Sequence, residues 1–234
     1  MKGSVWWLSQ LNNMGTYFDG FPKESIDFLW ELRMNNNTEW FNTNRGSYNI
    51  LIKEPMKLFA VEMAERLNNK RMGEVFVPAI SRANRDIRFS KDKSPYKDRK
   101  WVVFNYGEGR WQEKCCFYFE ISPEGWSSGM GFYEASSAYM AKYRKKLSAD
   151  TAGLKRLNNK LKKQTQFVVD VQLYKKNFVP EGADPEIVNW YQYRNLAIIS
   201  DYKITDSLFK REILDEVENG YEFLKPFFEF FKDI

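Results

Sequence analysis

The spacing of apolar residues changes along this chain, and that change limits the folds it can adopt. Apolar residues recur at helical intervals near both ends of the sequence. The middle differs, because it is rich in β-branched and aromatic residues over 101–106, 114–122 and 125–133. We therefore predict an α+β fold, with a central, mainly antiparallel sheet and helices at both ends of the chain.

The helical segments carry start and stop signals. Pro22 and early acidic residues favour a helix that ends at the asparagines 35–37, with an apolar face of Ile26, Leu29, Trp30 and Leu32. Thr38 can cap a second helix, which continues to Leu67 with a break or kink at Pro55. The other expected elements are a helical region over 135–164 broken near Gly153, strands over 166–174 and 191–200, and a terminal helix capped by Thr205 or Asp206.

The composition suits a single packed domain. The chain has 234 residues, of which 43% are hydrophobic, and no apolar run approaches the ~18 residues needed to span a membrane. The first residues lack a signal-peptide pattern, and Cys115 and Cys116 are strand neighbours that rarely form a disulfide. We predict a cytoplasmic protein with an N-terminal extension over 1–16 and one α+β domain over 17–234. Its oligomeric state stays open.

The absence of histidine restricts the chemistry of this protein. It excludes Ser-His-Asp and Cys-His catalytic systems and zinc sites that contain histidine. Two adjacent cysteines cannot supply four ligands, so bound zinc is not expected. Any reaction must use carboxylates, Lys, Tyr, Arg, hydroxyl groups or an oxygen-bound Mg²⁺. Glu120, Glu124 and Glu134 could supply a carboxylate pair of the glycosidase kind, but the sequence does not fix their separation.

One segment concentrates the positive charge. Residues 82–100, RANRDIRFSKDKSPYKDRK, hold eight cations and three acids, which is a net charge of +5. The whole chain also carries +5, so the remainder is neutral and the basic character is local. That concentration indicates a site or an anchoring network.

The local structure of this segment has two interpretations. Residues 85–89 alternate well enough for a strand, which would place Asp86 and Arg88 on one face as a charge-assisted pair. The residues that follow have loop chemistry, because Ser94-Pro95 favours a turn. The competing interpretation is a helical face. The proline and the charge density favour a strand followed by a loop.

Three functions remain open for the charged segment. It can be structural, as a solvated edge or an Arg–Asp network that holds the fold. It can be a pocket for a small phosphate-bearing anion, in which Asp86 and Asp92 orient cations or hold Mg²⁺ and Tyr96 contacts the ligand. The cations that would bind the anion are Arg82, Arg85, Arg88 and Lys93. The third function is a nucleic-acid-binding module that uses the same basic strip. The sequence names no reaction and indicates no membrane partner.

The same residues resemble a family signature. The pattern RxxRDxRFSKDKSPYK is similar to that of the conserved-hypothetical family called domain of unknown function 2461, and it falls on Arg82, Arg85, Asp86, Arg88, Phe89, Asp92, Lys93 and Tyr96. The opening FPKESIDFLWELRMNNNTEWF and the later GMGFY also resemble family segments, so the resemblance runs from about Tyr17 to the end. It implies a fold and no established activity. Thr38 stands where the family commonly has Arg, which weakens any role for a cation there.

The first prediction concerns the N-terminal extension. Because the family-like sequence begins near Tyr17, we expect residues 1–13 to contribute little to the core despite Trp6, Trp7 and Leu8. Deleting residues 1–13 should leave the melting temperature nearly unchanged. A large fall in melting temperature would show that the extension packs as part of the fold.

Overall fold

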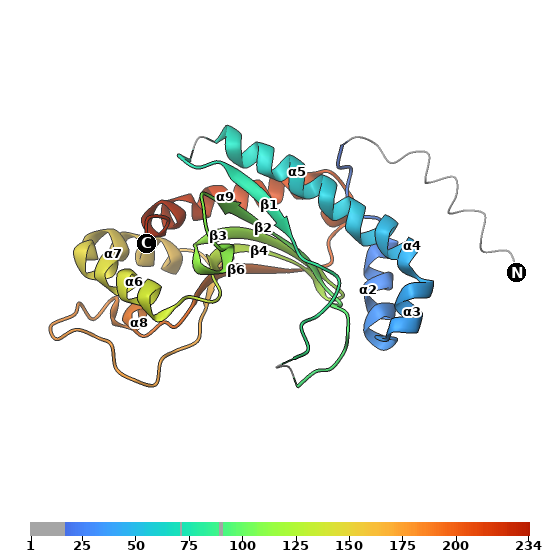
Figure 1. The fold of residues 1–234 in the computed structure, drawn as a ribbon. Coiled ribbons are helices and arrows are strands. Elements are labelled where there is room, and N and C mark those ends of the chain that lie inside the picture. Colours follow the sequence, from blue (N-terminus) through green and yellow to red (C-terminus); the bar gives the residue numbers. More distant parts are fainter. Residues whose placement is uncertain (1–16, 71, 89–90) are drawn as a thin grey trace, which may run out of the picture.

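A computed structural model gives the fold and describes residues 17–70, 72–88 and 91–234. The expected N-terminal extension and Phe89 lie outside these described residues. The protein contains a six-stranded antiparallel sheet with the strand order β1-β2-β3-β4-β6-β5 (Figure 1). Its strands are β1 Phe76–Ile80, β2 Lys100–Tyr106, β3 Cys116–Ser122, β4 Gly125–Phe132, β5 Val168–Asp170 and β6 Leu196–Lys203. The α+β fold expected from the sequence is confirmed.

Helices precede, interrupt and follow the sheet. Those before it are α2 Glu24–Met34, α3 Thr38–Thr43, α4 Arg45–Tyr48, the π-helical turn η2 Asn49–Lys53 and α5 Glu54–Asn69. The helices that follow the first strand, β1, are η3 Trp111–Glu113, α6 Ser137–Ala149, α7 Thr151–Lys162, α8 Val188–Tyr191, η4 Asp206–Phe209 and α9 Glu212–Phe231. In the described part of the chain, no helix is long and apolar enough to cross a bilayer.

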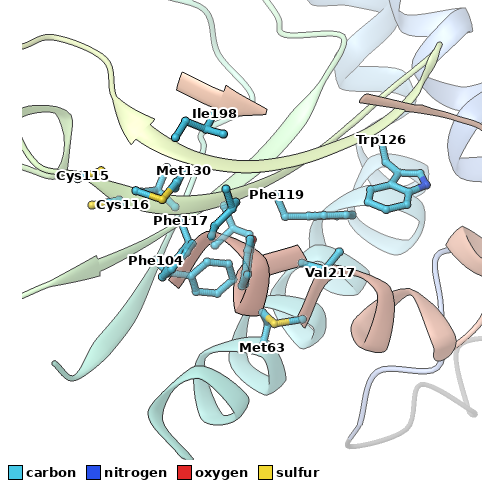
Figure 2. Packing of buried hydrophobic residues seen from close by; sticks show 14 of the residues in the cluster. Met63, Phe104, Cys115, Cys116, Phe117, Phe119, Trp126, Met130, Ile198 and Val217 are labelled. Atoms are coloured by element: carbon cyan, nitrogen blue, oxygen red, sulfur yellow. The ribbon is translucent and has the colours of Figure 1, made fainter. Parts of the chain in front are cut away.

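The core lies between the sheet and the two long helices. Figure 1 shows α5 and α9 packed on one face of the sheet, with α2–α4 at one end and α6–α8 at the other. Phe117 and Phe119 of β3 are fully buried, and they meet Met63 of α5 and Val217 of α9 in this layer (Figure 2). The aromatic residues that predicted the sheet therefore also form its main contact with the helices.

The opposite face of the sheet is less covered. Side chains alternate between the faces of a strand, so the residues next to the buried ones point away from α5 and α9. At the centre of that face they are half-buried or exposed, and we call this set the open face: Trp101, Tyr118, Glu120, Ser127 and Asp201. The first four are half-buried and Asp201 is exposed. Trp101 and Glu120 contact residues of the β1–β2 connection, which matters for the site described below.

Strand β1 is an element that the sequence analysis did not predict, and it contains Pro78. Proline cannot donate a ladder hydrogen bond, so it argues against a central strand. Here β1 lies at the edge of the sheet and pairs only with β2, where Pro78 faces Phe104 across the ladder. The edge position accommodates the proline.

Several element boundaries differ from the expected ones for local reasons. The cap of α3 is Asn37, whose side chain accepts a hydrogen bond from the Trp40 amide, and not Thr38. Trp30 of α2 is exposed, whereas Phe28 is buried. The helix expected to break or kink at Pro55 is helical without interruption from Arg45 to Asn69, and the π-helical turn η2 lies just before α5, whose second residue is Pro55. The break expected near Gly153 falls at Asp150, whose side chain caps α7.

The second prediction tests the contact between the sheet and the helices. Phe119 is fully buried, and its ring centroid lies 4.2 Å from that of Phe59 in α5. Phe119→Ala should lower the free energy of unfolding by about 3–5 kcal/mol, because it leaves a cavity in a close-packed core. Urea unfolding measures this loss, with Val77→Ala on the exposed side of β1 as the control. Equal effects of the two substitutions would contradict the assignment of this layer as the core.

Candidate functional site

The charged segment forms the β1–β2 connection, a long hairpin over residues 81–99 that we call the charged hairpin. It extends from the sheet away from α5 (Figure 1). Its two arms are joined by backbone bonds from the Arg85 amide to the Pro95 carbonyl (2.8 Å) and from the Lys97 amide to the Ala83 carbonyl (2.8 Å). A β-bridge between Asn84 and Tyr96 lies between them. Among the described residues of the hairpin, backbone pairing is thus found at its base.

The strand expected over residues 85–89 is wrong in the part that the structure describes, 85–88. The Asp86 carboxylate accepts a bond from the Arg88 backbone amide at 3.2 Å, a local turn that competes with strand pairing. The expected Asp86–Arg88 pair is present, with Arg88 Nε 3.0 Å and Nη2 2.7 Å from the two carboxylate oxygens. Both side chains are exposed, at 75% for Arg88 and 60% for Asp86.

Tyr96 anchors the hairpin to the helices. It is buried, and its ring stacks on Phe41 of α3 with centroids 3.8 Å apart. The Asn36 side chain accepts from the Tyr96 amide at 3.0 Å and donates to the Tyr96 carbonyl at 2.9 Å. The position expected to contact a ligand therefore lies in the packed base of the hairpin.

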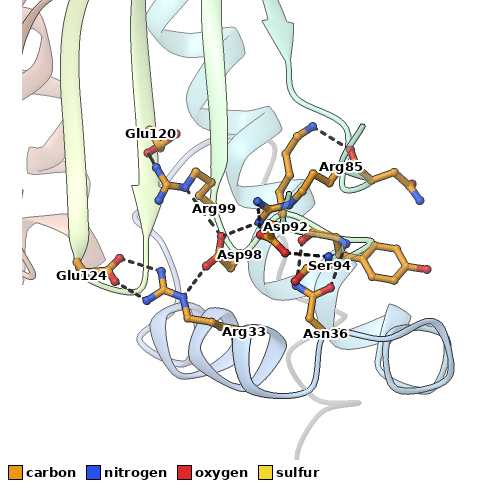
Figure 3. A network of polar contacts seen from close by, with 12 residues as sticks. Arg33, Asn36, Arg85, Asp92, Ser94, Asp98, Arg99, Glu120 and Glu124 are labelled. Carbon is orange, nitrogen blue, oxygen red and sulfur yellow. Dashed lines mark hydrogen bonds and ion pairs between the residues drawn. The ribbon is translucent and has the colours of Figure 1, made fainter. Parts of the chain in front are cut away.

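The Asp98 carboxylate is the centre of an ion-pair network (Figure 3). Its side chain is only 13% exposed, and Arg33 of α2 contacts it through Nε at 2.5 Å. Arg85 and Arg99 approach the other carboxylate oxygen at 3.6 and 3.9 Å. Each guanidinium group offsets part of the hydration that the Asp98 carboxylate loses on burial.

The network continues to the sheet. Arg33 also donates two hydrogen bonds to the Glu124 carboxylate at the β3–β4 turn, and this contact lowers the pKa of Glu124 to about 2. Arg99 pairs with Glu120 of β3 at 3.1 Å. Glu134 lies beyond the other end of β4 and pairs with Arg110, so the three glutamates do not converge into one carboxylate site.

The remaining cations of the hairpin are placed differently. Arg85 pairs with Asp92 at 2.7 Å, but the Lys93 ammonium bonds to the Ile87 carbonyl at 2.9 Å. Arg82 is exposed, and its side chain makes no hydrogen bond or ion pair within the described ranges. Two pockets of the described chain, of about 560 and 270 Å³, contain none of the hairpin cations, and Arg82, Arg88, Lys91 and Lys93 are exposed on the surface.

Two lysines that follow the motif support its incoming arm. Lys97 donates to the carbonyls of Arg82 (3.0 Å) and Asn84 (2.9 Å), and its ammonium lies 4.7 Å from the centroid of the Trp101 ring. Lys100 is buried and donates to the Ser81 carbonyl. Burial, with the nearby cations Lys97 and Lys53, lowers the pKa of Lys100 to about 8. Carbonyl partners leave the charge of these lysines uncompensated.

Metal binding has limited support. The acids considered for Mg²⁺, Asp86 and Asp92, each pair with an arginine of the hairpin. Among residues 17–70, 72–88 and 91–234, no group of three or more Cys, Asp or Glu side chains is placed to hold a metal ion.

The decisive comparison is with protein families. The model of the family described as conserved hypothetical protein (DUF2461) matches residues 24–230, which is most of the chain. The chain belongs to the DUF2461 family. No curated protein matches it. The DUF2461 match contains α2, the charged hairpin and the sheet, so the whole Asp98 network lies within the family domain.

The third prediction concerns Asp98 of this DUF2461 protein. Asp98→Asn leaves three guanidinium groups around a neutral amide, which should lower the free energy of unfolding by about 1–3 kcal/mol. That is less than for a fully buried pair, because the arginines are partly exposed. Asp86→Asn is the matched control, since it removes one carboxylate from an exposed pair and should leave the urea midpoint unchanged. Equal midpoints for both variants would show that the Asp98 network does not stabilise the fold.

Proposed function

We propose that this DUF2461 protein is a cytoplasmic protein that binds a small phosphate-bearing ligand on the charged hairpin. The ligand would meet the exposed cations of the hairpin, and the Asp98 network would hold the hairpin in place. Asp86 and Asp92 fit the expected role of orienting arginines, because each accepts a charge-assisted bond from one. Tyr96 contributes by fixing the base of the hairpin.

The observation that supports this proposal is the uncompensated charge. Of the eight cations over 82–100, three arginines pair with carboxylates: Arg85, Arg88 and Arg99. The other five have no carboxylate partner in the described part of the chain: Arg82, Lys91, Lys93, Lys97 and Lys100. Like charges held close together raise the free energy of the free protein, and a bound anion would relieve that repulsion.

The pKa directions agree with this repulsion. Burial lowers the pKa of Lys97, and the cations Arg82 and Arg85 lower it further. The position of the Lys97 ammonium is a separate observation, because two backbone carbonyls of the opposite arm accept hydrogen bonds from it. A phosphate beside Arg82 and Lys97 would supply the missing negative charge.

The fourth prediction is that inorganic phosphate raises the melting temperature relative to chloride at the same ionic strength, because it binds the folded protein. The double variant Arg82→Gln/Lys93→Gln should remove this stabilisation. Its matched control is Lys145→Gln/Lys162→Gln, which removes the same charge from exposed positions on α6 and α7. Arg88→Ala should also lose phosphate binding with only a modest loss of stability, since the pair is exposed.

Two outcomes would contradict the proposal. If phosphate stabilises the wild type no more than chloride does, the hairpin has no phosphate site. If Arg88→Ala also unfolds the protein, the motif serves as scaffold.

A further inference from the structure

The open face continues directly from the charged hairpin. Trp101, Glu120, Ser127 and Asp201 are successive cross-strand partners on β2, β3, β4 and β6. Neighbouring strands are about 4.8 Å apart, so these side chains form one row across the sheet. The row meets the hairpin at Trp101, which lies beneath the Lys97 ammonium, and at Glu120, which Arg99 contacts.

Tyr118 lies over the next position of this face because β4 has a glycine there. A Cβ atom at Gly129 would come within 2.9 Å of Tyr118 Cε1, so the glycine lets the ring approach the sheet. Burial raises the pKa of Tyr118, and the carboxylates of Asp201 and Glu120 raise it further. The phenol therefore keeps its proton and can donate a hydrogen bond.

The chemistry of the row differs from that of the hairpin. Carboxylates and side-chain hydroxyls accept hydrogen bonds from hydroxyl groups, and half-buried aromatic rings offer apolar surface. Glu120 and Asp201 lie two strands apart on the same face, at positions separated by Ser127. These groups suit a ligand body that is neutral and rich in hydroxyl groups.

The same acids disfavour a chain of phosphates across the face. Exposed aromatic residues on a sheet can stack nucleic acid bases, and a cationic track then follows the backbone. Here the track beyond the hairpin carries Glu120 and Asp201, which would repel successive phosphates. A ligand with one anionic group at the charged hairpin and an uncharged body over the open face is complementary to both surfaces.

We propose that the open face binds the hydroxyl-rich body of a monophosphorylated sugar or polyol, whose phosphate is held by the charged hairpin. This inference rests on the proposed phosphate site and adds the class of molecule that carries the phosphate. The side chains that would contact the body are Trp101, Tyr118, Glu120, Ser127 and Asp201.

Isothermal titration calorimetry at fixed ionic strength tests the binding of a phosphorylated sugar with four probes: methyl phosphate, glucose 6-phosphate, glucose and an eight-nucleotide oligouridylate. Methyl phosphate is a monoester of the same charge as glucose 6-phosphate without the sugar body. We expect glucose 6-phosphate to bind at least about tenfold more tightly than methyl phosphate, as two additional hydrogen bonds would give. Glucose alone should bind more weakly than glucose 6-phosphate.

Variants locate the effect on the open face. Asp201→Ala combined with Tyr118→Phe should reduce the glucose 6-phosphate advantage to about twofold or less and leave methyl phosphate binding in place. Tyr118→Phe removes only the hydroxyl group, and Asp201 is exposed, so the double variant should fold. Glu229→Ala removes an exposed carboxylate from α9 and should keep the full advantage.

The outcomes separate this inference from the proposed function. Equal affinities for methyl phosphate and glucose 6-phosphate would overturn the sugar assignment and leave the phosphate site standing. Binding of neither phosphate ester would overturn both. Tighter binding of the oligouridylate than of glucose 6-phosphate would make the face a nucleic-acid surface and overturn the inference. An unchanged advantage in the double variant would overturn the placement on the open face.

Discussion

The Asp98 carboxylate and its three arginines determine where the charged hairpin lies. Asp98 joins the end of the hairpin to α2 through Arg33, which in turn holds Glu124 at the β3–β4 turn. The described residues of the hairpin pair at its base, which gives few backbone bonds to fix its direction. The half-buried ion pairs orient the hairpin, because a guanidinium group binds a carboxylate in a defined geometry. The surface formed by the outer cations depends on this anchor.

The hairpin combines anchoring side chains and exposed cations within one motif. Tyr96 and Asp98 point inward and are buried or nearly so, while Arg82 and Arg88 are exposed. The three acids of the segment all contact arginines, whereas Lys93, Lys97 and Lys100 bond with carbonyl oxygens. An arginine fork matches a carboxylate, whereas a lysine ammonium acts as a compact charge. The result is a rigid base that carries a local excess of positive charge.

The sequence predicted the parts of this arrangement that depend on local chemistry. The β-branched and aromatic segments predicted β2, β3 and β4, and the pair between Asp86 and Arg88 is present, although a local turn replaces the strand from which it was expected. The role of Asp98 could not be predicted, because its partner Arg33 lies 65 residues away. Tyr96 shows the same limit, since its burial depends on Phe41 and Asn36 in a distant helical region. Spacing identified the side chains of the motif, and only packing shows which of them face solvent.

The position of the hairpin beside the open face follows from strand order. Strand β2 lies next to β3, so Trp101 of β2 is the cross-strand partner of Glu120 on the open face. The arm of the hairpin that enters β2 places the Lys97 ammonium over the Trp101 ring. A cationic edge and an acidic, aromatic face therefore become neighbours although their sequences are separate. Arg99 joins them by contacting Asp98 on one side and Glu120 on the other. A ligand with one charged end and a polar uncharged body is complementary to that junction, whereas a uniform polyanion or an apolar molecule matches only one side of it.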